Sequence, residues 1–196
     1  MPSPRTRRLL LDAEALRTRL AGWPQIEISG TAGMPAEIYR ITYHLRGLFV
    51  DVAGNITERN EHLLEINLSL GYPRRAPQCR MITPVFHPNF DLSSVCIGDF
   101  WAASEGLDDL VIRIGRMIAY QEYNTRSPLN GLAARWADEH AHLLPIDARA
   151  IAPPLAEDGE DLSQEAKQVH EQEGRAETSS ATATTDPWEE KIVIRD

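Results

Sequence analysis

Lysine is missing from residues 1–152, where all 16 basic residues are arginine. The two lysines of the chain, Lys167 and Lys191, both lie close to its C-terminal end. One explanation is codon bias in a GC-rich genome. A chemical explanation is that amines attack activated acyl groups, so a protein holding such a group benefits from having no lysine nearby. The two explanations are compatible.

Cysteines and long apolar runs are also scarce. The two cysteines, Cys79 and Cys96, form no CxxC pair, so neither a zinc or redox motif nor a cofactor is expected. Free thiols are typical of the reducing cytoplasm. No apolar run approaches the roughly 20 residues that span a bilayer, and Met1–Arg5 lack the apolar stretch of a secretory signal. We therefore expect a cytoplasmic protein with no membrane partner.

Negative charge is concentrated at one end of the chain. The whole chain has a net charge of −9, and residues 153–196 hold 12 acidic and four basic residues, a net charge of −8. Residues 1–152 are nearly neutral and offer no broad basic patch for a nucleic acid. The composition predicts a folded domain over 1–152 and an acidic, largely disordered tail over 153–196.

The end of the tail differs from the rest. Residues 186–196 combine an aromatic side chain with a β-branched triplet, a composition typical of a docking peptide. The side chains that would contact a partner are Trp188, Ile192, Val193 and Ile194. The alternative is a terminal strand that packs back onto the domain.

Hydrophobic periodicity predicts an α+β domain. Helical spacing over residues 5–21 marks a stripe of Leu9, Leu10, Ala13, Leu16 and Leu20. Alternation then predicts antiparallel strands over 25–29, 37–45 and 63–70 and around Cys79 and Met81, with a turn at 51–55. Cys79 is expected in the core. Helical spacing returns from Leu107 to Ile118 and after Asn130, a favourable N-cap.

The last helix and the first each carry an ambiguous feature. The apolar stripe of the last helix is expected to comprise Leu132, Ala133, Trp136, His140 and Leu143. His140 and His142 have no further ligands nearby in sequence, so no metal site is predicted. Arg5, Arg7 and Arg8 crowd the start of the first helix, where the helix dipole disfavours cations. They indicate either a binding role or a solvated arginine face.

One series of motifs resembles the active-site region of ubiquitin-conjugating enzymes. The motifs, in chain order, are Tyr72-Pro73, Pro77, His87-Pro88-Asn89, Cys96 and Ser127-Pro128-Leu129-Asn130. The resemblance covers about residues 5–145. It implies a fold with an N-terminal helix, a four-stranded antiparallel meander, an active-site loop and C-terminal helices. It also implies that Cys96 carries a ubiquitin-like protein as a thioester.

The chemistry of such a carrier explains the residue types. A thiolate is a strong nucleophile, and the pKa of a free cysteine is about 8.5. Attack on the thioester by an amine or a hydroxyl creates an oxyanion, which the Asn89 amide would stabilise, or around which it would order the loop. By resemblance, Cys96 is the nucleophile and Asn89 the supporting donor. His87 is expected to shape the loop by hydrogen bonds and not to act as a base.

The chain departs from the family pattern at several points. The segment from Asn89 to Cys96 is one residue shorter than in typical members. Ser127 stands where members often have an acidic residue that orients the incoming lysine; Ser127, Asp99 or Asn124 could contribute instead. The loops at Tyr72–Pro77 and 102–106 lack the side chains that usually meet RING ligases. The resemblance therefore favours transfer without a ligase.

These departures and the arginine-rich composition resemble bacterial members of the family. Such members act with a ThiF-type activating enzyme, a ubiquitin-like protein and a JAB-type peptidase, in gene sets associated with antiphage defence. Arg7 and Arg8 match the basic helix start at which members meet their activating enzyme. The rival interpretation is an inactive module that binds a ubiquitin-like protein or scaffolds an activating-enzyme complex. A papain-like hydrolase, with His87 as base, does not suit the order of elements.

Overall fold

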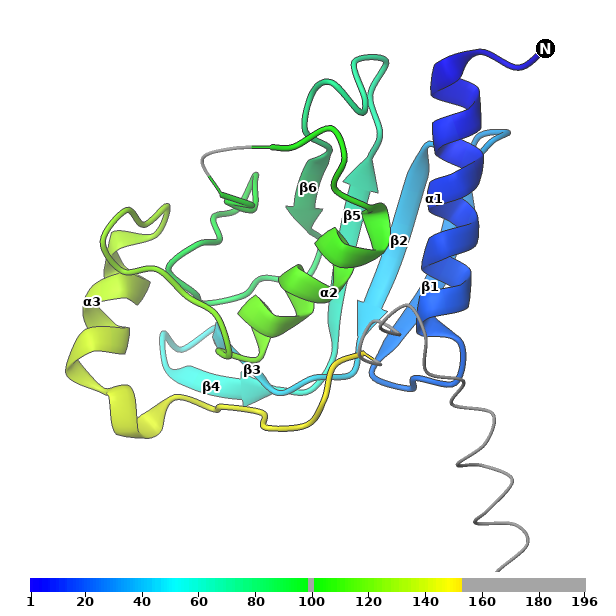
Figure 1. Cartoon of the computed structure of the whole chain (residues 1–196). Helices are drawn as coiled ribbons and strands as arrows, with labels where there is room; N and C mark the ends of the chain where they lie inside the picture. The colour runs from blue at the N-terminus through cyan, green and yellow to red at the C-terminus, as the bar shows by residue number, and fades with distance from the viewer. Residues whose placement is uncertain (99–100, 153–196) are drawn as a thin grey trace, which may run out of the picture. The chain divides into compact units, whose positions relative to one another are not determined.

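The computed structural model describes residues 1–98 and 101–152 (Figure 1). Its helices are α1 (Pro4–Leu20), α2 (Leu107–Ile118) and α3 (Gly131–Glu139), followed by a short 3-10 turn, Ala141–Leu143. Its strands are β1 (Ile26–Ala32), β2 (Ile38–Tyr43), β3 (Gly47–Val50), β4 (Ile56–Arg59), β5 (His62–Asn67) and β6 (Gln78–Met81). The expected α+β fold is confirmed: a helix, an antiparallel sheet of four strands, then helices.

The sheet has the strand order β1-β2-β5-β6, and every neighbouring pair is antiparallel. Ile41 of β2 is paired with Ile28 on one side and Leu64 on the other, and Leu64 is paired in turn with Met81. Because side chains alternate along a strand, this register puts apolar residues of successive strands on one face. That face supports the helices.

The meander is interrupted between β2 and β5. The predicted turn at 51–55 is present, but it closes a separate two-stranded sheet of β3 and β4. Asp51 holds this turn, because its Oδ1 accepts hydrogen bonds from the amides of Ala53 (2.9 Å) and Asn55 (2.8 Å). β3 and β4 have four residues each. Over so short a length, the alternation of apolar and polar residues does not separate them from the flanking strands in the sequence.

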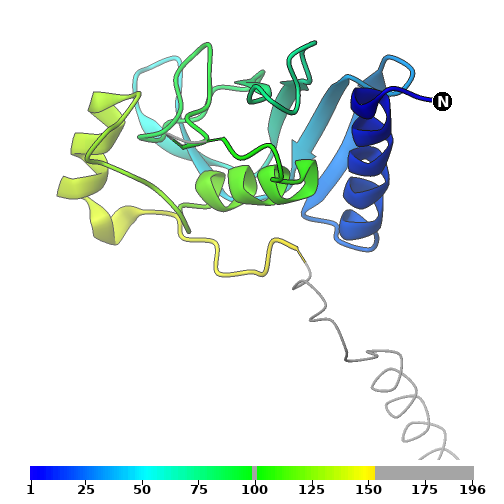
Figure 2. The same cartoon turned by 45° about the horizontal axis from the view of Figure 1, so that its top comes forward.

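One core joins the sheet to α1 and α2, which lie close together in both views (Figures 1 and 2). Cys79 is buried in this core, as expected. Two of the expected stripes are partly wrong, because Leu10 (52% exposed) and Leu132 (72% exposed) face outward. The buried residues of α3 are the small ones, Ala133, Ala134 and Ala137. Small side chains allow this helix to pack closely on the rest of the domain. Trp136 of the same helix is half-buried and packs against Phe86 (5.9 Å between ring centroids).

Two arginines at the start of α1, Arg5 and Arg8, donate hydrogen bonds within the domain. Arg5 donates from Nη1 to Glu37 Oε1 (2.6 Å) and from Nη2 to the carbonyl of Leu68 (2.9 Å). Arg8 donates from Nε to Asp12 Oδ2 (2.8 Å). These partners offset the unfavourable helix dipole, and the Ser3 side chain caps the helix by accepting from the amide of Thr6.

Asp12 joins three elements although it lies in the apolar stripe of α1. It is 4% exposed, and its Oδ2 accepts hydrogen bonds from Arg8 and from the hydroxyl of Tyr72 (2.6 Å). Its Oδ1 accepts from the amide of Leu107 (3.4 Å), at the N-terminus of α2, where a carboxylate is favoured. Next to this turn, Trp101 donates from Nε1 to the carbonyl of Pro73 (2.6 Å). The Tyr72-Pro73 turn, α1 and α2 are therefore fixed through one carboxylate.

Tyr72→Phe is predicted to lower the free energy of unfolding by about 1.5–3 kcal/mol, the typical contribution of a hydrogen bond to a charged group. Urea unfolding followed by circular dichroism measures the change. Tyr123→Phe is the control, because Tyr123 is 42% exposed. Equal stability of the Tyr72→Phe variant and the wild type would show that the hydrogen bond from Tyr72 to Asp12 contributes nothing to stability.

Candidate active site

Cys96 lines a cavity of about 250 Å³ between the loop that follows β6 and the segment that follows α2. The other lining residues are Asn89, Ile97, Gly98, Arg113, Met117, Glu122, Tyr123, Asn124 and Ser127. Three of the predicted site residues, Cys96, Asn89 and Ser127, therefore meet at one place. The fourth, His87, lies beneath them and is fully buried.

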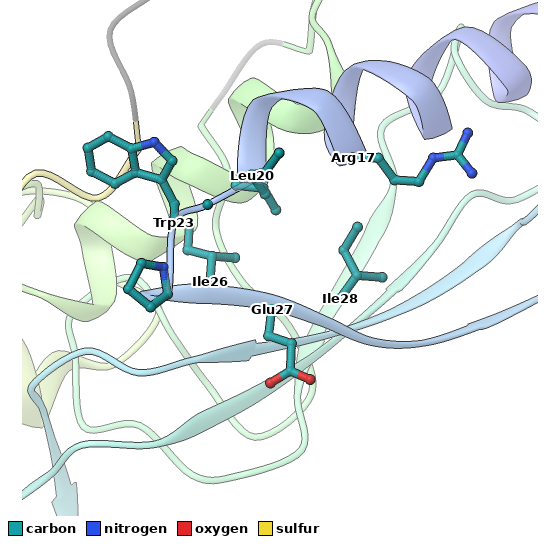
Figure 3. A pocket seen from close by; sticks show the side chains of 9 residues that line it. Arg17, Leu20, Trp23, Ile26, Glu27 and Ile28 are labelled. Atoms are coloured by element: carbon teal, nitrogen blue, oxygen red, sulfur yellow. The ribbon is translucent and has the colours of Figure 1, made fainter. Parts of the chain in front are cut away.

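A second cavity, of about 650 Å³, lies between the end of α1 and β1 (Figure 3). Leu20, Trp23, Ile26 and Ile28 make most of its wall apolar, and Arg17 and Glu27 lie at its edge. None of the residues that line it is a cysteine, serine or histidine. This cavity therefore does not hold the thiol on which the expected chemistry depends.

The two cysteines differ in accessibility. Cys79 is 6% exposed, and burial raises the pKa of its thiol to about 12, so it stays protonated near neutral pH. Cys96 is only half-buried. A reagent can therefore reach the sulfur of Cys96, and the thiolate form of that sulfur would be the nucleophile.

The short loop from Asn89 to Cys96 is closed on itself. The amide of Cys96 donates to the carbonyl of Asn89 (2.9 Å), and the amide of Val95 donates to the carbonyl of Cys79 in β6 (3.1 Å). Within the loop, Asp91 Oδ1 accepts from the amides of Ser93 and Ser94, both at 2.6 Å. These amide hydrogen bonds, led by that of Ser93, lower the pKa of Asp91. The loop thus holds Cys96 next to Asn89.

The Asn89 side chain connects this loop to the segment after α2. Its Oδ1 accepts from the amide of Asn124 (2.8 Å), and its Nδ2 donates to the carbonyl of Asn124 (3.4 Å). A second connection runs from the amide of Asn130, the N-cap of α3, to the carbonyl of Pro88 (3.0 Å). Both walls of the cavity are therefore joined through the His-Pro-Asn segment.

His87 supports Asn89 from below. Its Nδ1 accepts from the amide of Asn89 (3.0 Å), which leaves the proton of the neutral ring on Nε2. Its ring packs against Phe90 (4.8 Å between centroids) and Tyr120 (4.6 Å). Nε2 is buried and faces the backbone of Glu122, short of regular hydrogen-bond geometry. Burial lowers the pKa of His87 to about 3, so the ring remains neutral at physiological pH.

The turn after α2 has an unusual residue at its centre. Tyr120 has a φ of +53°, in the left-handed region where helix ends usually have glycine. Hydrogen bonds from Tyr120 to the carbonyl of Met117 and from Gln121 to that of Arg116 form a Schellman motif. The Tyr120 hydroxyl donates to the carbonyl of Phe86 (2.7 Å), which favours tyrosine despite the strain. This turn leads the chain toward the cavity.

The arginines predicted to bind a partner have different surroundings. Arg7 is exposed. Arg8 instead donates to Asp12, to the Tyr72 hydroxyl (3.1 Å) and to the carbonyl of Ala103 (2.5 Å), so its guanidinium is used inside the domain. A partner surface on α1 would therefore use Arg7 and not Arg8.

Several predicted residues lie outside the residues that the structure describes. They are Asp99 and the tail residues Trp188, Ile192, Val193 and Ile194. Within 1–98 and 101–152, no three His, Cys, Asp or Glu side chains are grouped so that they could hold a metal ion. No described helix is long and apolar enough to span a membrane.

The sequence analysis did not identify the two charged residues that line the cavity. Arg113 and Glu122 line it, and Arg113 is paired with Glu105 (2.6 Å). Arg113 belongs to the helical pattern of α2, where its direction follows from helical periodicity. Glu122 lies in irregular chain after the Tyr120 turn, and no sequence pattern predicts its direction.

Comparisons with known proteins agree with the fold described above. The family model described as "Ubiquitin-conjugating enzyme" matches residues 29–144, which include every element of the Cys96 cavity. A solved structure titled "Novel Ubiquitin-Conjugating Enzyme" is 17% identical to the chain, with a TM-score of 0.54. The match covers 72% of this chain and 90% of that one. At this identity the likeness shows the fold.

The free energy of unfolding is predicted to fall as the pH drops from about 6.5 to about 5. An unfolded histidine binds a proton below its ordinary pKa of about 6.5, whereas folded His87, with a pKa of about 3, does not. This difference in pKa lowers the free energy of unfolding by about 2 kcal/mol at pH 5. His62, whose pKa burial lowers to about 4, adds a similar loss.

The His87→Gln variant should lose about 2 kcal/mol less than the wild type between those pH values, whatever its stability at pH 7. His142→Gln is the control, because His142 is exposed. Urea unfolding at the two pH values gives the numbers. An unchanged pH dependence in His87→Gln would contradict the assignment of a buried neutral ring.

Proposed function

The chain belongs to the ubiquitin-conjugating enzyme family, and from this premise we propose that Cys96 carries a ubiquitin-like protein as a thioester. An activating enzyme would deliver the modifier, and the thioester would pass it to a target. The observation that carries the proposal is the half-buried Cys96 thiol in a cavity joined to Asn89. Cys79, whose thiol is buried, has no such access.

Loading is an exchange between two thioesters. The Cys96 thiolate attacks the carbonyl carbon of the incoming thioester, the new C–S bond forms, and the old C–S bond breaks to release the thiolate of the activating enzyme. One C–S bond replaces another, so the step requires no energy source beyond the thioester itself. Accessibility of the sulfur is the main requirement, and Cys96 meets it.

Asn89 would assist transfer in two ways. Its hydrogen bonds to Asn124 hold the two walls of the cavity together. The hydrogen bond that Nδ2 donates to Asn124 is long, at 3.4 Å. The Nδ2 group can therefore also donate to an oxyanion formed on the Cys96 thioester. His87 would act through Asn89, by fixing its backbone amide. Ser127, which is exposed in the cavity, would contact the incoming nucleophile.

The finer biological setting rests on the sequence. We propose a bacterial conjugation pathway with a ThiF-type activating enzyme and a JAB-type peptidase, associated with antiphage defence. Exposed Arg7 would meet the activating enzyme. Residues 186–196, with Trp188 and Ile192–Ile194, would dock a partner of the same pathway. The reducing cytoplasm suits a free catalytic thiol.

The direct test uses ubiquitin with a C-terminal 2-mercaptoethanesulfonate thioester, which replaces the activating enzyme. Non-reducing gels should show a covalent adduct on the wild type that a reducing agent removes. Cys79→Ser should load equally, and Cys96→Ala should not load. Cys96→Ser, when charged with activating enzyme and ATP, should form an oxyester that resists thiols.

Two results would refute the thioester proposal. One is an intact, folded wild type that forms no adduct, which would favour an inactive binding module. The other is an adduct that persists in Cys96→Ala.

A further inference from the structure

Glu122 is the only carboxylate among the described residues that line the Cys96 cavity. The position at which family members often have an acidic residue is occupied by Ser127, whose hydroxyl cannot accept a proton at neutral pH. The cavity thus contains one anionic group, at a different point of the chain.

The segment that carries Glu122 is fixed on both sides. Before it, Tyr120 is held by its hydrogen bond to the carbonyl of Phe86 and by the ring of His87. After it, Asn124 is bound through both its amide and its carbonyl by the Asn89 side chain. Only one residue separates Glu122 from each of these anchors. The backbone at Glu122 is therefore held in place relative to Asn89, whose carbonyl accepts a hydrogen bond from the amide of Cys96.

The carboxylate of Glu122 remains within reach of a substrate. Its side chain is 43% exposed and forms an ion pair with Arg116 at 3.3 Å, which is itself 49% exposed. Exposed ion pairs of this kind contribute little free energy, so an incoming ammonium group can replace the arginine. Arg113, the cation among the described residues that line the cavity, is paired with Glu105 at 2.6 Å. Because Arg113 is paired with Glu105, the Glu122 carboxylate remains available to a substrate.

We propose that Glu122 is a catalytic residue that binds the ammonium group of the acceptor and removes its proton. This proposal rests on the proposed thioester at Cys96. The freed amine attacks the thioester carbonyl carbon, the C–N bond forms and the C–S bond breaks. Of the two protons that the ammonium nitrogen loses, Glu122 accepts one and passes it to solvent. The other ends on the Cys96 sulfur, which leaves as the thiol.

The experiment separates loading from discharge. The wild type, Glu122→Gln and Glu14→Gln are charged with the ubiquitin thioester and then mixed with Nα-acetyl-lysine, whose side-chain amine is the acceptor. Glu14 is the matched control, because it also forms an exposed ion pair with an arginine, Arg17, but lies on α1 away from the cavity. Urea unfolding verifies that each variant is folded.

Glu122→Gln should load at the wild-type rate and discharge about 100-fold more slowly at neutral pH, a typical loss for general-base catalysis. The defect should shrink toward about pH 9.5, because more of the lysine amine, with a pKa of about 10.4, is then already neutral. Hydroxylamine, which is neutral at pH 7, should discharge both proteins equally. Ser127→Asp added to Glu122→Gln should restore part of the rate, since it returns a carboxylate to the cavity.

Several outcomes would overturn the role of Glu122. They are normal loading with unchanged discharge to Nα-acetyl-lysine, a defect that is the same at every pH, and an equal defect with hydroxylamine. An equal defect in Glu14→Gln would also count against it. A wild type that fails to load refutes instead the thioester at Cys96, so the two proposals fail in different steps.

Discussion

The candidate site depends on the hydrogen bonds between the Asn89 side chain and the backbone of Asn124 (2.8 and 3.4 Å). Asn89 is 5% exposed, so leaving its side chain without hydrogen-bond partners would be costly. Through them the loop that holds Cys96 and the segment that holds Glu122 form one cavity. His87 adds to this constraint by binding the Asn89 amide, and it remains a neutral, buried support.

A second buried polar group organises the opposite end of the domain. Asp12 joins α1, the Tyr72-Pro73 turn and the N-terminus of α2. The C-terminal end of α2 leads to the strained Tyr120 and so to the wall of the Cys96 cavity. One helix therefore connects the two networks. Its apolar face, which includes Leu110 and Ile114, fixes it on the sheet.

The sequence predicted the parts of the fold that follow from periodicity. α1, α2 and the four strands of the sheet lie where alternation and helical spacing predicted them, and Asn130 caps α3 as expected. The strand expected over 63–70 is shorter, because β5 ends at Asn67 and Leu70 is 87% exposed. The β3–β4 hairpin was missed because four-residue strands carry little pattern. Asp12 was missed because a carboxylate in an apolar stripe has no partner visible in sequence.

The residues of the candidate site also include some that the sequence predicted and some that it did not. Cys96, Asn89 and Ser127 were placed by their motifs and do meet in one cavity. Glu122 depends on the left-handed Tyr120, which no local pattern indicates. The inward direction of Arg8 depends on carbonyls almost a hundred residues away, such as that of Ala103. The directions of Glu122 and Arg8 are thus set by tertiary contacts, whereas Cys96, Asn89 and Ser127 belong to local motifs.

The most direct measurement of the central claim is amide hydrogen exchange at Asn124 in two variants of Asn89. Asn89→Ala removes the acceptor of the Asn124 amide, whereas Asn89→Asp retains an Oδ acceptor at the same place. The account predicts fast exchange at Asn124 in Asn89→Ala, retained protection in Asn89→Asp, and no change at Leu64 in the sheet. Equal protection of Asn124 in the wild type and Asn89→Ala would contradict it.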